Sequence, residues 1–215
     1  PRPESGGEFK KEWVQHYVNR PSLGLNTYIL VDPASEKKKN SDYTAAFVVG
    51  LGADQNYYIL EFVRDRLSLT QRADLVLRLH RKYKPMTVGY EKYGMQADVE
   101  HLKDRMEREQ YRFPVVELGG QLKKEDRIRR LIPLFEAGRV WFPRQLNYTG
   151  SDNVLRDLVR DFIEDEYAPF PVGRHDDMMD CLARITDEAL GARFPRERQE
   201  QPHRVASGGA GWMGA

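Results

Sequence analysis

Three runs rich in β-branched and aromatic residues follow one another closely in the first third of the chain. They cover residues 27–32 (TYILVD), 43–52 (YTAAFVVGLG) and 56–65 (NYYILEFVRD), and only short polar stretches separate them. Residues of these types favour strands, and strands joined by short connections pair in an antiparallel manner. The sequence therefore predicts a three-stranded antiparallel meander.

Helical and strand-like patterns alternate after this meander. Ser68 and Gln71 form a capping-box pattern that predicts a helix over residues 70–83. Next come a strand (86–91), a helix and a second strand (113–118). A basic helix then starts near Gln121 and is expected to end at Gly138. The basic helix is expected to turn four residues inward despite Pro133, namely Ile128, Leu131, Ile132 and Phe135.

The last third of the chain is expected to add an edge strand and two helices. RVWFP (139–143) is the expected edge strand, Ser151 the expected cap of the next helix, and GRHDDMMDCLARI (173–185) the region of the last one. The helix after Ser151 should bury Val154, Leu155, Leu158, Val159 and Phe162.

The order βββαβαβα predicts an α/β fold with a mixed sheet, in which three antiparallel strands precede parallel ones and helices flank the sheet. A chain of 215 residues, 40% of them hydrophobic, suits one domain, which we assign to residues 27–190. Residues 1–26 are interpreted as a polar lead-in with one short helix around Phe9, Trp13 and Tyr17. Residues 191–215 lack periodicity and are predicted to be a disordered tail.

Charge and cysteine content narrow the classes of function. The 34 Lys and Arg residues nearly balance the 33 Asp and Glu residues, so any nucleic-acid surface must be local. The single cysteine, Cys181, forms no internal disulfide, which is typical of a reducing cytoplasm. No apolar stretch approaches the roughly 20 residues of a membrane span, and the first residues do not resemble a signal peptide. We therefore expect a soluble intracellular protein.

Three carboxylates, Asp176, Asp177 and Asp180, stand at the start of the last predicted helix. Helix capping explains one or two acids at such a place, because carboxylates accept hydrogen bonds from free backbone N–H groups and complement the helix dipole. Three acids within five residues exceed what a cap needs. Capping nevertheless stays open as the alternative to a functional role.

Two more acids, Asp32 and Glu91, each end an apolar strand. Taken singly, Asp32 suits an Asx turn before Pro33, and Glu91 suits an ion pair with Lys92 or Lys123. If the two strands are neighbours and the last helix packs across them, however, the acids converge, and their repulsion costs several kcal/mol unless a cation neutralises it. Oxygen ligands favour Mg²⁺ or Mn²⁺. Two such ions about 4 Å apart support in-line hydrolysis of a phosphodiester.

Four motifs in this order resemble the C-terminal nuclease domain of the large terminase subunit of tailed bacteriophages. They are VDPA followed by SDYTA, GYE followed by YGMQA, KKEDRIRRLIPLFEAGRVWFP, and GRHDDMMDCLA, and the resemblance spans about residues 9–190. It implies a ribonuclease H-like fold and a metal-dependent endonuclease. Such an enzyme cuts concatemeric double-stranded viral DNA during genome packaging with little sequence specificity.

The resemblance also implies roles for individual acids. Asp32 would be the first metal ligand, shared by both ions, Glu91 the second and Asp177 the third, with Asp176 as the competitor for the third position. Asp180 matches an acidic position that resolvases use. Asp42 lies where some terminases place an additional acid, and His175 either contacts the scissile phosphate or begins the helix.

Basic residues flank these acids in two places, and the partners follow from the resemblance. Lys37, Lys38 and Lys39 lie after Asp32, and Lys123, Lys124 and Arg127 open the basic helix, so both groups are candidates for DNA phosphate contacts, with solvated lysines as the alternative. No G-x-x-x-x-G-K-[ST] loop occurs, so the ATPase domain of a terminase is missing. The portal and the small terminase subunit are expected partners in the host cytoplasm, and the isolated domain is expected to be a monomer.

Two other functions remain open at this point. One is another ribonuclease H-like nuclease, of the resolvase or transposase type, which would cut junctions or transfer strands. The other is a non-catalytic module that docks on DNA or the portal and whose acids serve only as helix caps.

Overall fold

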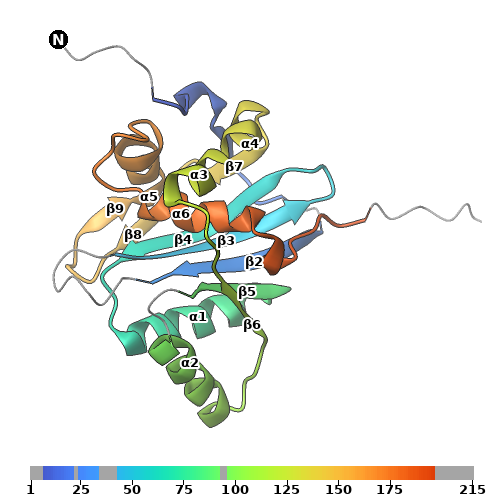
Figure 1. Ribbon diagram of the computed structural model, residues 1–215, viewed down its shortest axis with the longest axis vertical. Coiled ribbons are helices and arrows are strands. Elements are labelled where there is room, and N and C mark those ends of the chain that lie inside the picture. The colour runs from blue at the N-terminus through green and yellow to red at the C-terminus, as the bar shows by residue number, and fades with distance from the viewer. Residues whose placement is uncertain (1–6, 22–23, 34–42, 93–95, 197–215) are drawn as a thin grey trace, which may run out of the picture.

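A seven-stranded mixed sheet forms the centre of the computed structural model, which describes residues 7–21, 24–33, 43–92 and 96–196 (Figure 1). The strand order is β1-β7-β4-β3-β2-β5-β6. The strands are β1 (Gln15–Tyr17), β2 (Leu25–Asp32), β3 (Thr44–Gly52), β4 (Tyr57–Asp65), β5 (Thr87–Glu91), β6 (Val115–Leu118) and β7 (Val140–Pro143).

The pairing within the sheet confirms the predicted mixed arrangement. β2, β3 and β4 form the antiparallel meander, whereas β5 runs parallel to β2 and β6 parallel to β5. β7 pairs in parallel with β4 on one side and with β1 on the other. The expectation that β7 is an edge strand is therefore wrong, because β1 occupies the edge.

Helices cover both faces of the sheet, as Figure 1 shows. α1 (Leu69–Tyr83) and α2 (Gln96–Arg108) pack on one face. The other face carries α3 (Lys124–Arg129), α4 (Ile132–Glu136), α5 (Leu158–Asp161), the π-helix η2 (Phe162–Tyr167) and α6 (Asp177–Ala183), followed by the short 3₁₀ turns η3 (Arg184–Thr186) and η4 (Glu188–Leu190). Each face has its own hydrophobic core.

The capping box predicted for α1 is present. The Ser68 hydroxyl accepts a hydrogen bond from the Gln71 amide at 3.3 Å, and the Gln71 side chain accepts one from the Ser68 amide at 2.8 Å. Two of the free N–H groups at the start of the helix are satisfied in this way.

The basic segment from residue 121 to 138 forms two short helices instead of the single one expected. Proline lacks an amide hydrogen and clashes with the preceding turn, so it is tolerated only in the first turn of a helix. Pro133 accordingly stands in the first turn of α4. Gly138, with a φ of +64°, follows α4 as predicted.

The helix expected after Ser151 is also wrong in its first half. Residues 147–157 form the hairpin of β8 (Asn147–Thr149) and β9 (Leu155–Asp157), and Asp157 caps α5 by accepting from the Val159 amide. Leu155, expected in the core, is 66% exposed. Leu158, Val159 and Phe162 are buried as predicted.

The described residues of the lead-in, 7–21 and 24–26, pack with the rest of the domain. It forms the 3₁₀ turn η1 (Lys11–Trp13) and strand β1 in place of the expected short helix, and Phe9 lies in the core. At the other end, Phe194, which was assigned to the tail, packs its ring on Tyr57 of β4 with 5.2 Å between centroids. No helix among the described ranges has the length and apolar character that a bilayer crossing requires.

Candidate metal centre

Asp32 and Glu91 lie side by side on the face of the sheet that α6 covers. Side chains alternate along a strand, and Leu30 packs in the core under α6 whereas Val31 packs under α1, so Asp32 points toward α6. Tyr90 likewise packs under α1, which turns Glu91 to the opposite face. Val31 pairs with Tyr90 in the parallel register of β2 and β5. The two acids that follow this pair are therefore neighbours at the carboxyl ends of both strands.

α6 brings a third carboxylate to this place. It packs on β2 and β3 through Met178, Cys181 and Leu182, which lie in the core, and the Cys181 thiol donates to the Ala45 carbonyl at 3.4 Å. Asp180, only 4% exposed, is thereby directed toward the strand ends.

One carboxylate oxygen from each of Asp32, Glu91 and Asp180 lies within 4.8 Å of the other two. The structure therefore brings together Asp32 and Glu91 as expected. Asp180, which the sequence ranked as secondary, completes this group, and Asp177 is not part of it.

We call Asp32, Glu91 and Asp180 the acidic triad. Two arginines pair with two of its members, Asp180 and Glu91. Arg127 donates from Nε and Nη2 to the two oxygens of Asp180 at 2.6 and 2.7 Å. Arg184 donates from Nε to Glu91 Oε2 at 3.0 Å and from Nη2 to Glu91 Oε1. Bidentate pairs of this kind fix the orientation of a carboxylate as well as neutralising it.

Asp32 differs from its two neighbours. Within the described part of the chain, no basic side chain lies within ion-pair distance of Asp32. Burial, followed by the charges of Glu91 and Asp180, raises the pKa of Asp32 well above its ordinary value. A divalent cation bound among the three acids would relieve this repulsion, and the all-oxygen donor set suits Mg²⁺ or Mn²⁺. The residues thus fit such an ion.

Lys124 lies beside the triad, among the acids of the α6 start. Its ammonium nitrogen is 2.7 Å from Asp176 Oδ1, 3.5 Å from Asp177 Oδ1 and 3.9 Å from Asp180 Oδ2. Burial alone would lower the pKa of Lys124, but the hydrogen bond to Asp176 and the surrounding carboxylates raise it. Lys124 is therefore a fixed positive charge at the edge of the acidic cluster.

The start of α6 is capped from outside the helix. Asp176, the residue at the N-cap position, makes no capping hydrogen bond with its side chain. Glu166 Oε2 instead accepts hydrogen bonds from the amides of Met178 at 2.7 Å and Met179 at 3.0 Å. Burial raises the pKa of Glu166 to about 7, although these hydrogen bonds and Arg64 act in the opposite direction. Capping therefore does not account for Asp176.

The remaining candidates lie around the triad or outside the described residues. The His175 ring meets Tyr43 edge-on at 6.1 Å, ahead of the helix start at Asp177. Lys123 is exposed, whereas Arg127, a candidate for DNA phosphate contact, is buried and pairs with Asp180. Asp42, Lys37, Lys38 and Lys39 fall outside the described residues.

Sequence reasoning gave no role to Arg184, Glu166 and Arg64. Arg184 follows Asp180 by four residues, so helical spacing places both on one face, and this signal was available. Glu166 belongs to the acidic run EDE (164–166), in which nothing distinguishes the buried acid from its exposed neighbours. Arg64 lies 3.4 Å from Glu166 Oε1, a contact between residues a hundred positions apart.

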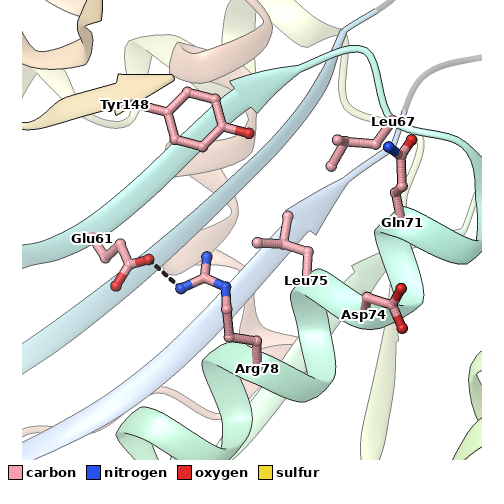
Figure 2. A pocket seen from close by; sticks show the side chains of 7 residues that line it. All are labelled: Glu61, Leu67, Gln71, Asp74, Leu75, Arg78 and Tyr148. Carbon is pink, nitrogen blue, oxygen red and sulfur yellow. Dashed lines mark hydrogen bonds and ion pairs between the residues drawn. The ribbon is translucent and has the colours of Figure 1, made fainter. Parts of the chain in front are cut away.

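Two pockets of similar volume lie in the described part of the chain, one beside the triad and one beside α1. One of about 400 Å³ adjoins the triad and is lined by residues that include Arg127, Arg130 and Arg184. The other, of about 420 Å³, lies between α1 and β4 beneath Tyr148, and Figure 2 shows the ion pair of Glu61 with Arg78 at its edge. It contains no residue that the sequence singled out for the site.

Comparison with known proteins places the chain in a family. The family described as Terminase RNaseH-like domain matches residues 29–186, whereas no curated protein matches the chain. The human cytomegalovirus terminase nuclease domain, Mn soaked and inhibitor bound, is 12% identical over 86% of this chain and 97% of its own, with a TM-score of 0.58.

Two phage structures have the same fold. The large terminase nuclease from thermophilic phage G20c is 18% identical over 88% of this chain and 100% of its own (TM-score 0.55). The HK97 bacteriophage large terminase is 11% identical over 87% of this chain and 43% of its own (TM-score 0.50). At these identities the structural likeness supports the ribonuclease H-like fold, and the family match carries the assignment. The chain therefore belongs to the terminase ribonuclease H-like domain family.

Proposed function

We propose that this domain cleaves concatemeric double-stranded DNA during viral genome packaging, with little sequence specificity, at the acidic triad. The observation that carries the proposal is the convergence of one oxygen each from Asp32, Glu91 and Asp180 within 4.8 Å. Arg127 and Arg184 pair with two of the three acids, and the repulsion that Asp32 adds favours a bound cation among them. A terminase nuclease domain soaked with Mn supports the same class of ion.

The triad would hold Mg²⁺ or Mn²⁺. Bound divalent ions supply an activated water for attack on phosphorus and stabilise the leaving oxygen, and two of them are proposed to act together. Asp32 would contribute to both sites, as the resemblance to terminase nuclease domains implies. Asp177, with Asp176 as its alternative, is the acid that would complete a second site.

The basic residues have separate roles in this proposal. Arg127 and Arg184 orient Asp180 and Glu91 through bidentate hydrogen bonds, and these carboxylates would help to hold the ion. Lys124, at the edge of the triad, would attract the DNA backbone close to the cut, and exposed Lys123 would extend that contact. Phosphate contacts of this type tolerate any sequence and weaken with salt.

The domain would act within a larger assembly. The HK97 large terminase is more than twice as long as the part that matches this chain, which supports an ATPase domain in the parent protein. DNA, the portal and the small terminase subunit are the proposed partners, and the host cytoplasm is the proposed location.

A plasmid-cleavage assay tests the proposal. The wild-type chain should nick and linearise supercoiled DNA with Mn²⁺ or Mg²⁺ and be inactive in EDTA, and Asp32→Ala should abolish cutting. Asp104→Ala is the matched control, because Asp104 is an exposed acid on α2, which covers the opposite face of the sheet. Cutting by a folded Asp32→Ala protein would contradict the proposal. Cleavage restricted to branched substrates would favour a resolvase-like activity instead.

A further inference from the structure

Glu166 is a fully buried acid that lies outside the triad and touches the helix that carries Asp180. Its exposed fraction is 0%. It belongs to η2, a π-helix in which the Ala168 amide bonds to the Ile163 carbonyl five residues back. π-Helical turns are rare and are found often at functional sites, because the wide turn redirects side chains.

The first turn of α6 depends on this acid. The amides of Met178 and Met179 have no acceptor within the helix, and both donate to the same oxygen, Glu166 Oε2. Met179 directly precedes Asp180. The two hydrogen bonds therefore hold the backbone of the turn from which the Asp180 side chain extends.

The local capping residue has another partner. An Asp at the N-cap position ordinarily accepts from the first amides of its helix. Asp176 instead lies 2.7 Å from Lys124 and makes no capping bond. Asp176 pairs with Lys124 and does not cap α6, and Glu166 of η2 accepts the hydrogen bonds of the first turn instead.

Arg64 on β4 completes this arrangement. Its Nε is 3.4 Å from Glu166 Oε1, and its Nη2 is 4.0 Å from Asp177 Oδ2. The guanidinium also stacks over the Tyr43 ring at 4.1 Å. Through Arg64, ion pairs connect β4 with η2 and with the start of α6. These ion pairs do not involve the carboxylates of the triad.

We propose that Glu166 is a positioning residue of the nuclease. It fixes the first turn of α6 and thereby sets the Asp180 carboxylate at the distance from Asp32 and Glu91 that a divalent ion requires. This inference rests on the proposed function of the triad. Residues that support ligands in this indirect way change metal affinity by about 10–100-fold when they are lost.

The test measures Mn²⁺ binding by isothermal titration calorimetry in the intact 215-residue chain. Glu166→Ala removes the acceptor and should weaken the Kd for Mn²⁺ by about 10–100-fold. Glu166→Gln keeps an acceptor oxygen at the same place and should restore most of that loss. Glu164→Ala is the matched control and should bind Mn²⁺ like the wild type, because Glu164 lies on the same helix but is exposed and, among the described residues, pairs only with Lys11.

Each outcome decides between the possibilities. A folded Glu166→Ala protein with wild-type Mn²⁺ affinity overturns the inference, as does a Glu166→Gln protein as weak as Glu166→Ala. If Glu166→Ala does not fold, hydrogen exchange of the Met178 and Met179 amides decides. Slow exchange in the wild type and in Glu166→Gln supports the inference, and fast exchange overturns it. Absence of Mn²⁺ binding in the wild type would reject the proposed function itself, and this result is distinct from a selective loss in Glu166→Ala.

Discussion

The guanidinium of Arg127 donates two hydrogen bonds, of 2.6 and 2.7 Å, to the carboxylate of Asp180, and both side chains are buried. A buried carboxylate that loses such a partner keeps its charge without compensation, because little water reaches it. The pair therefore links the stability of the fold to the charge of the candidate metal centre.

Replacement of Arg127 by Met tests this link. Arg127→Met should lower the free energy of unfolding of the metal-free protein by about 3 kcal/mol, because buried Asp180 would lose its bidentate partner and keep the longer, 3.9 Å contact to Lys124. Mn²⁺ should recover part of the loss, so the rise in Tm on adding Mn²⁺ should be larger in the variant. Arg108→Met, which breaks an exposed pair with Asp104, should cost at most about 0.5 kcal/mol. Equal losses in the two variants would contradict the assigned role of Arg127.

Matched substitutions distinguish whether Asp180 or Asp177 is the third metal ligand. Asp180→Asn should reduce Mn²⁺ affinity more than Asp177→Asn, because only Asp180 has an oxygen within 4.8 Å of both Asp32 and Glu91. We expect a loss in cleavage rate of at least about 100-fold for Asp180→Asn, which corresponds to roughly 2.7 kcal/mol of activation free energy. Single-turnover cleavage of linear DNA measures the rate. A larger effect of Asp177→Asn on both quantities would restore Asp177 as the third ligand.

Asp32→Asn should stabilise the metal-free protein while abolishing its activity. Because the pKa of Asp32 is higher in the folded than in the unfolded chain, its ionised form disfavours folding at neutral and higher pH. This cost disappears as the pH falls toward the ordinary carboxyl value of about 3.9. In EDTA at pH 8 the variant should therefore melt roughly 2–4 °C higher, the shift expected for about 1 kcal/mol. That advantage should shrink on acidification and reverse in saturating Mn²⁺, and a Tm below that of the wild type at pH 8 in EDTA would argue against repulsion in the triad.

Lys124→Gln should weaken DNA binding and its dependence on salt. One phosphate contact fewer reduces the slope of log Kd against log salt by about 1. Fluorescence anisotropy with a labelled duplex in EDTA measures the slope without cleavage. Lys103→Gln removes an exposed lysine from α2 and is expected to leave the slope unchanged. Identical slopes for both variants would place Lys124 among residues that only neutralise the acids.

The sequence predicted the elements that have strong local signals. The meander, α1 with its capping box and the parallel strands β5 and β6 are present because periodicity and cap residues act within a few positions. The helix predicted for residues 151–157 was wrong, because Leu155 has the spacing of a buried helical residue yet lies exposed on a hairpin. Asp157, and not Ser151, caps the helix, and the Ser151 hydroxyl donates to Asp65 on β4. Ser151 and Asp65 are 86 positions apart in the sequence, so local patterns do not reveal this hydrogen bond.

The candidate site was predictable to the level of its acids and no further. Strand-end position identified Asp32 and Glu91, because the parity of each strand is visible in the sequence. The ranking of Asp177 against Asp180 depends on how far α6 is rotated over β2, and local sequence does not contain that angle. The partners of the acids, Arg127 and Arg184, depend on the same tertiary packing, and so does the Glu166 cap.

Strand β1 has a practical consequence for anyone who shortens this chain. It covers the outer side of β7, which would otherwise present unpaired backbone groups along residues 140–143. An uncovered strand of that kind recruits strands from other molecules. Trimming the protein to its apparent start at Leu25 would also remove Phe9 from the aromatic packing with Phe135, Tyr167 and Phe170. Expression of such a truncated form should give aggregates, and a usable boundary lies before residue 9.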